Sequence, residues 1–327
     1  MANVQTYFNK FHETIRRSYE DNSTLRDRRD LLLDDLRDGL RRYAQNHNVK
    51  IPRFEHFNQG SYAIGTGIEP LTGEDYDIDV GLEFHLSKDD YPPVEVKKWV
   101  HDALDTGNRT VEYKRPCVRV QYHRAGVGIY HVDLAVYSES AYNWYNQTYL
   151  AKGFLGSASE DQIWEVSEPK KLIETFQQKF QNQEGHRDQF RRIIRFLKRW
   201  KDVKFRAGGN GRPTGISITA CALEWFQIGT RYDPSDGKYY YDDLTALKNL
   251  AQAIINQFDW WTGRMRVNLP VPPNNDLFEK MSDNQMENFK NRLEALRDDL
   301  SQVERTVDTL TACHLLQDVF GDDFPTP

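Results

Sequence analysis

Two carboxylates stand at alternate positions of a short apolar run. Asp77 and Asp79 lie within the segment 76–82, Tyr-Asp-Ile-Asp-Val-Gly-Leu. This run predicts a β-strand, and side chains two residues apart on a strand point to the same side, so the two carboxylates should lie side by side. Like charges held that close repel each other, and a divalent cation that accepts carboxylate oxygens relieves the repulsion. The pair therefore favours a metal site.

A glycine–serine turn precedes the two carboxylates. The segment 60–66, Gly-Ser-Tyr-Ala-Ile-Gly-Thr, offers a hydroxyl group and bare backbone N–H groups. These are groups that bind a phosphate chain. Taken alone, a glycine–serine pair is most often a plain turn, and an isolated Asp-x-Asp is usually a solvated strand face or a loop. The combination of a metal site with a phosphate site suggests phosphoryl or nucleotidyl transfer.

A third carboxylate, Asp133, stands in the middle of another strand-like run, 129–137. Between two apolar neighbours its charge needs a partner, since burying an unpaired carboxylate is costly. Three carboxylates on two adjacent strands would hold two metal ions, one that activates an attacking hydroxyl and one that stabilises the leaving phosphate. We therefore predict Asp77, Asp79 and Asp133 as catalytic residues and metal ligands.

Hydrophobic periodicity predicts the elements that must position these residues. The predicted helices cover 3–46, 94–104, 190–201, a segment from 212–219 through 226, 244–258, and a last long helix from Asp283 to about Leu316. Further strands are predicted at 111–113 and 118–122. The prolines within 269–276 predict an extended segment before the last helix.

The order Gly-Ser, Asp-x-Asp and a later strand Asp is the pattern of the DNA polymerase β-like nucleotidyltransferases. Within them the chain resembles the bacterial relatives of cyclic GMP-AMP synthase, the DncV-like CD-NTases of CBASS anti-phage operons, over nearly its whole length. The resemblance implies an α+β fold in which a polymerase β-like lobe, a mixed sheet with helices, joins a helical second lobe. The active site would lie in the cleft between them. We predict a catalytic lobe with an N-terminal bracing helix over 1–165 and a substrate-binding lobe over 166–327.

The resemblance also implies phosphate-binding residues in both lobes. In the first lobe, the Gly60 backbone and Ser61 would hold the β- and γ-phosphates. In the second, the run Phe-Leu-Lys-Arg-Trp at 196–200 is similar to a helix on which family members carry a phosphate-binding lysine. Lys198 is the candidate for this role and Lys201 the second choice.

Ser217 matches a serine that contacts the terminal phosphates in family members. From the residues alone, a serine at a helix start would be an N-cap. The basic helix that carries the two lysines would likewise be read as a solvated face with no special role for most of its charges.

The implied reaction joins ATP and other NTPs into a cyclic di- or trinucleotide second messenger, with adenine as the expected base and pyrophosphate as the leaving product. The cofactor would be two Mg²⁺ ions, for which Mn²⁺ can substitute. The expected partners are a downstream effector that binds the product and a HORMA-type or other CBASS regulatory protein, while a nucleic-acid activator is left open. Three alternatives remain: an enzyme that modifies RNA ends or a protein, an inactive nucleotide-binding regulator, and a helical scaffold whose acids bind metal structurally.

Composition limits the class of protein further. Of the 327 residues, 39% are hydrophobic and 28% charged, which is ordinary for a globular protein. A net charge of −6 argues against broad wrapping around nucleic acid but allows a local basic groove. Three widely spaced cysteines predict free buried thiols in a reducing cytoplasm. No apolar run reaches membrane-spanning length, so we expect a cytoplasmic protein without a membrane partner.

Overall fold

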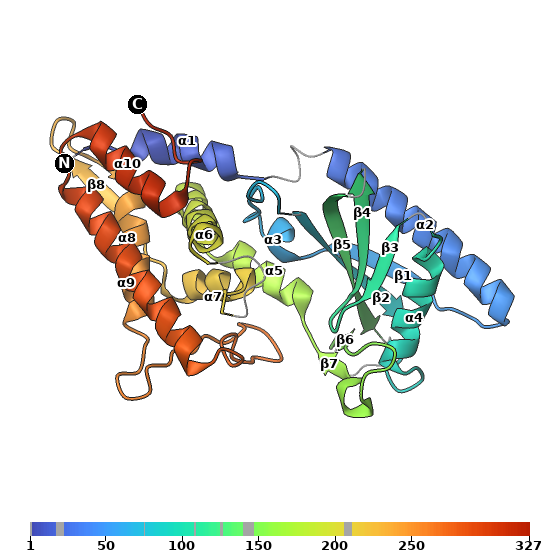
Figure 1. The fold of residues 1–327 in the computed structure, drawn as a ribbon. Helices are drawn as coiled ribbons and strands as arrows, with labels where there is room; N and C mark the ends of the chain where they lie inside the picture. Colours follow the sequence, from blue (N-terminus) through green and yellow to red (C-terminus); the bar gives the residue numbers. More distant parts are fainter. Residues whose placement is uncertain are drawn as a thin grey trace.

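The computed structural model describes residues 2–17, 23–74, 76–107, 109–124, 127–139, 147–205 and 211–327. They form a lobe built on a sheet and a lobe built of helices (Figure 1). The helices are α1 (Gln5–Ile15), α2 (Ser23–His47), α3 (Gly60–Ala63), α4 (Pro93–Leu104), a 3₁₀ helix (Ser159–Asp161), α5 (Pro169–Gln178), α6 (Glu184–Lys204), α7 (Gly215–Trp225), α8 (Asp243–Ile255), α9 (Asp283–Arg305) and α10 (Thr309–Phe320). The strands are β1 (Phe54–Asn58), β2 (Tyr76–His85), β3 (Thr110–Tyr113), β4 (Val118–Arg124), β5 (Val127–Glu139), β6 (Tyr149–Ala151), β7 (Trp164–Val166), β8 (Thr230–Asp233) and β9 (Lys238–Tyr241).

The sheet of the first lobe is mixed. Its strands run in the order β1-β2-β5-β4-β3, and β6 and β7 extend it from β5. Strands β2 and β5 are parallel, whereas the other pairs are antiparallel. A mixed sheet with helices beside a helical lobe is the α+β architecture that we predicted from the sequence, which is thus confirmed.

One face of this sheet is apolar and covered. Val80, Val132 and Leu134 are fully buried in a cluster that includes Leu36 of α2 and Trp99 of α4. These two helices lie on the side of the sheet that is turned away from the helical lobe (Figure 1). Because side chains alternate along a strand, the residues between these valines and leucines point to the opposite face, toward the helical lobe.

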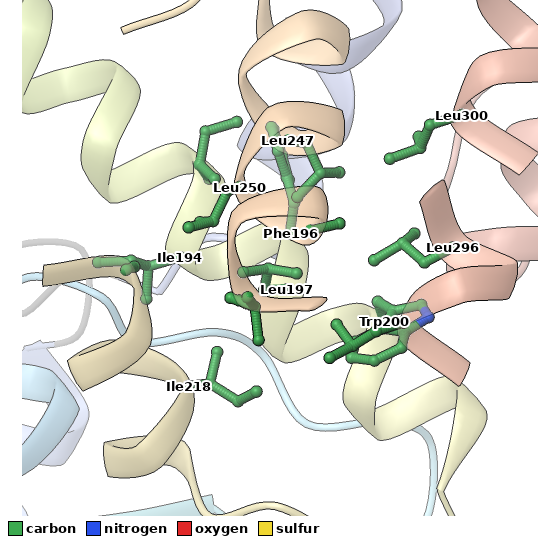
Figure 2. Packing of buried hydrophobic residues seen from close by; sticks show 14 of the residues in the cluster. Ile194, Phe196, Leu197, Trp200, Ile218, Leu247, Leu250, Leu296 and Leu300 are labelled. Atoms are coloured by element: carbon green, nitrogen blue, oxygen red, sulfur yellow. The ribbon is translucent and has the colours of Figure 1, made fainter. Parts of the chain in front are cut away.

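Helix α6 forms the centre of the helical lobe. Figure 2 shows Leu197 and Trp200 of this helix packed among Leu247 of α8, Leu296 of α9 and Ile218 of α7. All five side chains are almost completely buried. Because its side chains are buried on this scale, α6 is a rigid support. It therefore fixes the positions of the basic residues that lie along the same helix.

Helices α1 and α2 together form the segment predicted as helix over 3–46, but they pack against different lobes. Phe8 and Phe11 of α1 are fully buried and lie 5.3 and 5.2 Å from Phe196 of α6, between ring centroids. Helix α2 packs on the sheet instead. The N-terminal segment therefore contacts both lobes, and the lobe boundary at 165/166 stays a prediction.

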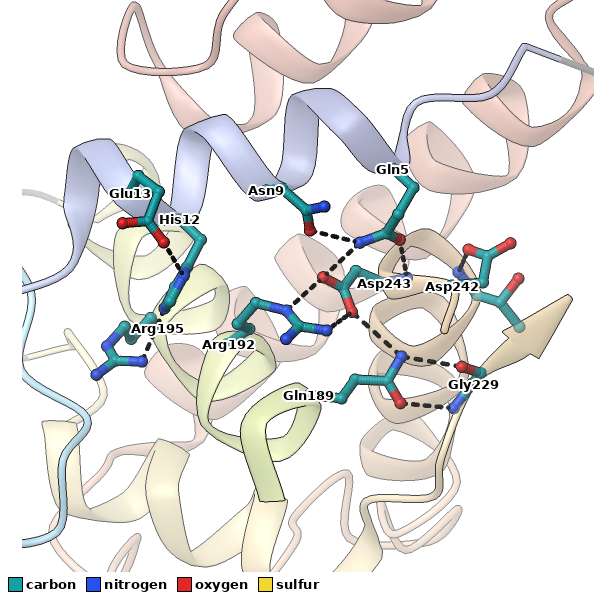
Figure 3. Close-up of polar contacts among 11 residues, drawn as sticks. Gln5, Asn9, His12, Glu13, Gln189, Arg192, Arg195, Gly229, Asp242 and Asp243 are labelled. Atoms are coloured by element: carbon teal, nitrogen blue, oxygen red, sulfur yellow. Dashed lines mark hydrogen bonds and ion pairs between the residues drawn. The ribbon is translucent and has the colours of Figure 1, made fainter. Parts of the chain in front are cut away.

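A buried polar network fixes α1 on the helical lobe (Figure 3). The fully buried carboxylate of Asp243 accepts hydrogen bonds from Arg192 at 2.7 and 3.0 Å, from Gln189 at 3.1 Å and from Gln5 of α1 at 3.0 Å. The backbone N–H of Asp243 donates to the Gln5 side chain at 2.8 Å. Every oxygen of this carboxylate is thus used, as burial of a charge requires.

Replacement of Asp243 by alanine should destabilise the protein strongly. The change leaves the Arg192 guanidinium largely buried without its carboxylate, and removal of one partner of such a pair costs about 3–5 kcal/mol. Chemical denaturation should report this loss in the free energy of unfolding. The exposed, capping Asp308 is a matched control, whose change to alanine should cost only about 1 kcal/mol.

The last long helix, predicted as continuous from Asp283 to about Leu316, is interrupted. Helix α9 ends at Arg305, and α10 begins at Thr309. The carboxylate of Asp308 accepts a hydrogen bond at 2.7 Å from the backbone N–H of Thr311, so it caps a new helix. Apolar periodicity alone does not reveal this break.

Two further observations concern the cysteines and the search for membrane-spanning helices. Cys117, Cys221 and Cys313 are buried and free, as predicted. Among the described residues, no helix combines the length and the apolar character needed to cross a bilayer.

Candidate active site

Asp77, Asp79 and Asp133 lie on one face of the sheet, as the alternation along a strand predicts for Asp77 and Asp79. The parallel pairing of β2 with β5 places Asp79 directly opposite Asp133 and Asp77 opposite His131. Residues opposite each other on neighbouring strands share a face. The three carboxylates therefore belong to the face that is turned toward the helical lobe.

The negative charge of Asp79 is unfavourable in its surroundings. Burial, together with the nearby carboxylates of Asp133 and Asp77, raises the pKa of Asp79 from 3.8 to about 7, although Lys198 and Arg119 act in the opposite direction. Among the described residues no ion pair is found for it. A carboxylate in this position gains most from a cation in the cleft.

Arg119 and His131 already contact the two other carboxylates. Both oxygens of Asp133 accept hydrogen bonds from Arg119, from Nε and Nη2, each at 2.7 Å. Asp77 contacts Nε2 of His131, and its side chain is 61% exposed. Within the described part of the chain, no three carboxylate, histidine or cysteine side chains are arranged to hold a metal jointly.

The donor set nevertheless suits a divalent cation at Asp77 and Asp79. Both are hard oxygen donors on one strand face, and burial beside two other carboxylates, which raises the pKa of Asp79, is a condition that a bound cation would relieve. Arg119 already occupies one acceptor site on each oxygen of Asp133, so it competes with a metal there, and the role of Asp133 as a ligand stays a prediction. The sequence pattern did not reveal Arg119 as a competitor, because it lies opposite Asp133 on the antiparallel strand β4.

The glycine–serine turn packs directly on Asp79. Gly60 has a φ of +68°, in the left-handed region, and a Cβ atom at this position would overlap with Oδ2 of Asp79. The Gln59 N–H donates to the Asp79 carbonyl at 3.1 Å. Ser61 follows in the short helix α3. The two motifs singled out in the sequence therefore form one local unit.

A cleft of about 780 Å³ lies between the lobes. Of the predicted site residues, six line it: Gly60, Ser61, Asp77, Asp79, Lys198 and Lys201. The cleft contains a cationic wall of Lys198, Lys201 and Arg212, all from the helical lobe, in which Asp202 pairs with Lys201 and Arg212 and Glu74 pairs with Arg212. Asp133 does not line the cleft. With divalent cations held at Asp77 and Asp79, a phosphate chain in the cleft would be neutralised from both sides.

Lys198 is held by the segment that follows the turn. Its Nζ donates to the carbonyl and to the hydroxyl oxygen of Thr66, both at 3.0 Å. Burial and the neighbouring cations Lys201 and Arg195 lower the pKa of Lys198 from 10.5 to about 7. A bound polyphosphate would favour its charged form again. Lys201 lies 3.0 Å from the carboxylate of Asp202, between Nζ and Oδ1.

Ser217 is placed differently from the other candidates. Its side chain is fully buried and donates to the Thr214 carbonyl at 2.9 Å, and it does not line the cleft. The N-cap of α7 is Thr214, whose hydroxyl accepts from the Ser217 N–H at 3.2 Å. The N-cap interpretation of Ser217 is therefore wrong, because the helix begins three residues earlier. Its phosphate contact stays a prediction, and the residues of this turn that line the cleft include its neighbours Thr214, Gly215 and Ile216.

Two arginines of α6 hold the same segment as Lys198. Arg195 donates to the carbonyls of Gly67 and Gly65, at 3.1 and 2.7 Å, and Arg199 donates to the carbonyl of Glu69 at 2.7 Å. Both arginines are buried. The spacing 195, 198 and 199 puts all three cations on one helical face. This face is thus not solvated, contrary to the usual role of a basic helix, and it binds the two lobes together.

Residues 52–137 match the family model for the nucleotidyltransferase domain of cyclic GMP-AMP synthase DncV-like proteins. Among solved structures, the chain is similar to Vibrio cholerae DncV cyclic AMP-GMP synthase, with a TM-score of 0.74, 18% identity, and coverage of 99% of this chain and 98% of that one. It is also similar to DncV in complex with the linear intermediate 5′ pppA(3′,5′)pG, with a TM-score of 0.75, 17% identity and coverage of 99% and 97%. The 3′-deoxy ATP-bound form gives a TM-score of 0.77 at 17% identity, with coverage of 99% and 96%.

These likenesses extend over both lobes. At such identities they show the fold, and they confirm the predicted architecture of a mixed-sheet lobe joined to a helical second lobe. The family match covers β1, β2, β4 and most of β5, which are the strands that carry and surround the three carboxylates. The resemblance stated from the sequence is confirmed for residues 52–137, which match the DncV-like nucleotidyltransferase domain, and over both lobes it is confirmed as a likeness of fold.

Proposed function

We propose that this chain, which carries a nucleotidyltransferase domain of the DncV-like family, joins NTPs into a cyclic di- or trinucleotide and releases pyrophosphate. The observation that supports this most is the parallel register that sets Asp79 beside Asp133, with the Gly60 turn packed on Asp79. An adenine-containing product is proposed by likeness to DncV, whose structures include one with a linear adenine–guanine intermediate.

In the proposed reaction, a ribose hydroxyl oxygen forms a bond to the α-phosphorus of an NTP, and the bond from that phosphorus to the β-phosphate oxygen breaks. Bound at the carboxylates, Mg²⁺ would lower the pKa of the attacking hydroxyl and neutralise charge on the phosphates. Asp77 and Asp79 would hold the two ions, and Asp133 would complete one of them once Arg119 has moved aside. Mn²⁺ should substitute for Mg²⁺.

The chain's other residues would position the triphosphate. Ser61 and the Gly60 backbone would hold the β- and γ-phosphates from the sheet lobe, while Lys198 and Lys201 would neutralise them from the helical lobe. Ser217 would assist only if α7 shifts. Such positioning, together with charge neutralisation, is the main source of rate acceleration in phosphoryl and nucleotidyl transfer.

The proposal includes a biological role by resemblance to the CBASS enzymes. The product would act as a second messenger in anti-phage defence and bind a downstream effector in the cytoplasm. A HORMA-type or other CBASS protein would regulate the enzyme. Co-purification with proteins encoded beside its gene, followed by activity measurement with and without them, tests this part.

The direct test uses nucleotides alone. The purified protein is incubated with ATP, GTP, CTP, UTP and Mg²⁺, and the products are identified by mass spectrometry. We expect pyrophosphate and a cyclic nucleotide product without any added acceptor. Activity that appears only with RNA or a protein acceptor would identify a modifying enzyme instead, and nucleotide binding without pyrophosphate release would identify an inactive regulator.

Replacement of Lys198 by alanine should weaken ATP binding by roughly tenfold or more, because a charge-assisted contact to phosphate is lost. The melting temperature should change less, since burial of this ammonium is itself unfavourable, as its lowered pKa shows. Because Lys198 loses its proton as the pH rises through about 7, the affinity difference between wild type and variant should shrink from roughly pH 6 to pH 8.

Lys204→Ala is the matched control, because Lys204 ends the same helix and does not line the cleft. Isothermal titration calorimetry and thermal melting on the three proteins make the comparison. Equal losses of affinity and stability in Lys198→Ala would favour a purely structural lysine.

A further inference from the structure

Glu168 lines the cleft but has no place in the reaction described above. The residue is 5% exposed, and its Oε1 atom is buried without a hydrogen-bond partner among the described residues. A buried acceptor that has lost its water and gained no donor is costly, and native structures contain few of them. This oxygen therefore calls for a donor that a ligand in the cleft can supply.

The position of Glu168 in the fold does not explain why its side-chain oxygen Oε1 is buried without a hydrogen-bond donor. It is the N-cap residue of α5, where a carboxylate ordinarily accepts a hydrogen bond from the first turn of the helix. Here the side chain makes no such bond. Its other oxygen, Oε2, lies 3.4 Å from Nζ of Lys171, whose side chain is 53% exposed. That loose contact with a half-solvated lysine leaves Oε1 unused.

The surroundings of Glu168 indicate which part of a nucleotide would meet it. The neighbouring lining residues Pro169, Leu172 and Ile173 are uncharged, whereas the cationic wall of the cleft is formed by Lys198, Lys201 and Arg212. A carboxylate repels phosphate oxygens, so the triphosphate belongs at the cationic wall. The apolar surface beside Glu168 suits a ribose or a base, and both offer neutral hydrogen-bond donors.

We propose that Glu168 is a specificity-determining residue whose Oε1 accepts a hydrogen bond from a ribose hydroxyl or a base N–H group of a nucleotide in the cleft. The inference rests on the proposed function, which places nucleotides there. A site built around a buried acceptor discriminates strongly against analogues that lack the matching donor, because the acceptor is then left unpaired.

Calorimetric titration of the full-length protein tests the inference. The probes are ATP and GTP, their 2′-deoxy and 3′-deoxy forms, and purine riboside triphosphate, which lacks the exocyclic amino group. Glu168→Ala, which removes the acceptor, should lower the affinity for the preferred nucleotide by about tenfold or more. Glu168→Gln keeps an acceptor oxygen without the charge and should lower the affinity less. The analogue without the bonded donor should bind wild type as weakly as Glu168→Ala binds the parent nucleotide, and Glu168→Ala should not distinguish the two.

The pattern among analogues separates the two sources of the donor. If affinity is lost for a deoxy form but not for the purine analogue, Glu168 bonds to the ribose. If affinity is lost for the purine analogue but not for the deoxy forms, Glu168 bonds to the base. Equal affinity of wild type and both variants for every probe would overturn the inference. So would Lys171→Ala if it reproduced the loss, since the ion pair alone would then explain Glu168. If wild type bound none of the nucleotides, the proposed function would fail, and this inference with it.

Discussion

Replacing Asp77 and Asp79 together by asparagine should lower pyrophosphate release from NTPs by at least about a thousandfold while the protein stays folded. The two side chains share one strand face, at the cleft, with the Gly60 turn against one of them. Asparagine keeps their size but removes the charges that would hold Mg²⁺. A colorimetric pyrophosphate assay measures the loss.

The same substitution should raise the melting temperature near neutral pH when no metal is added. The pKa of Asp79 is raised from 3.8 to about 7, so its ionisation opposes folding. The native state binds the proton more tightly than the unfolded state, and wild-type stability therefore falls as the pH rises from about 4 to about 7. Asparagine removes this cost. Added Mg²⁺ should then stabilise the wild type but not the variant.

Asp89 and Asp90 provide a matched control, because they are adjacent, exposed acids of the same lobe and do not line the cleft. Their double change to asparagine alters the net charge equally and should leave both activity and its Mg²⁺ dependence intact. Pyrophosphate release at the wild-type rate by the Asp77/Asp79 variant would contradict the assignment of these two residues as Mg²⁺ ligands.

Replacing Gly60 by alanine should lower pyrophosphate release by at least about a hundredfold, although it changes no charged residue. The added Cβ atom would overlap with Oδ2 of Asp79, so either the carboxylate or the turn must move. The substitution also strains the backbone, since φ at this position is +68°. Steady-state kinetics should show a reduced kcat, because the reacting groups are misplaced.

The change of Gly73 to alanine separates the overlap with Asp79 from the backbone strain. Gly73 also has a positive φ, of +88°, but a Cβ atom there would meet nothing within 4 Å. Gly73→Ala should therefore cost about 1–2 kcal/mol of stability, from backbone strain alone, and keep its activity. If Gly60→Ala remained as active as Gly73→Ala, the contact between the turn and Asp79 would have no bearing on catalysis.

The face of the sheet that carries the carboxylates could be predicted from the sequence, because alternation along a strand is a local property. Asp77 and Asp79 follow from it directly, and the burial of Val80 on the opposite face agrees. The parallel register of Asp79 with Asp133 joins segments more than fifty residues apart. Local patterns do not set such a pairing, which required the resemblance to a known fold.

Other features of the site depend on long-range contacts and could not be predicted. Arg119 pairs with Asp133 across an antiparallel strand pair, and no spacing in the sequence signals that competition. Arg195 and Arg199 are buried because the sheet lobe approaches α6. The basic composition of this helix, by contrast, is typical of a solvated face. Glu168 is an ordinary acid in the sequence, and only the cleft makes it notable.

Local cues failed in two places for a shared reason. A helix start is set by the residue whose side chain accepts from the first turn, and both Thr214 and Asp308 do so in the structure. The apolar pattern continues past such a cap. As a result, Ser217 was assigned to a helix start that lies at Thr214, and α9 and α10 were predicted as one helix.

The central claim is that the carboxylates of β2 and β5 bind shared cations beside a nucleotide. Crystals grown with Mn²⁺ and a nonhydrolysable ATP analogue, with anomalous diffraction to locate the metal, test it most directly. We predict Mn²⁺ in contact with both Asp77 and Asp79, the analogue's phosphates between that metal and Lys198, and Asp133 released from Arg119. Mn²⁺ bound elsewhere, with Asp79 unliganded and the Arg119–Asp133 pair intact beside the bound nucleotide, would contradict the account.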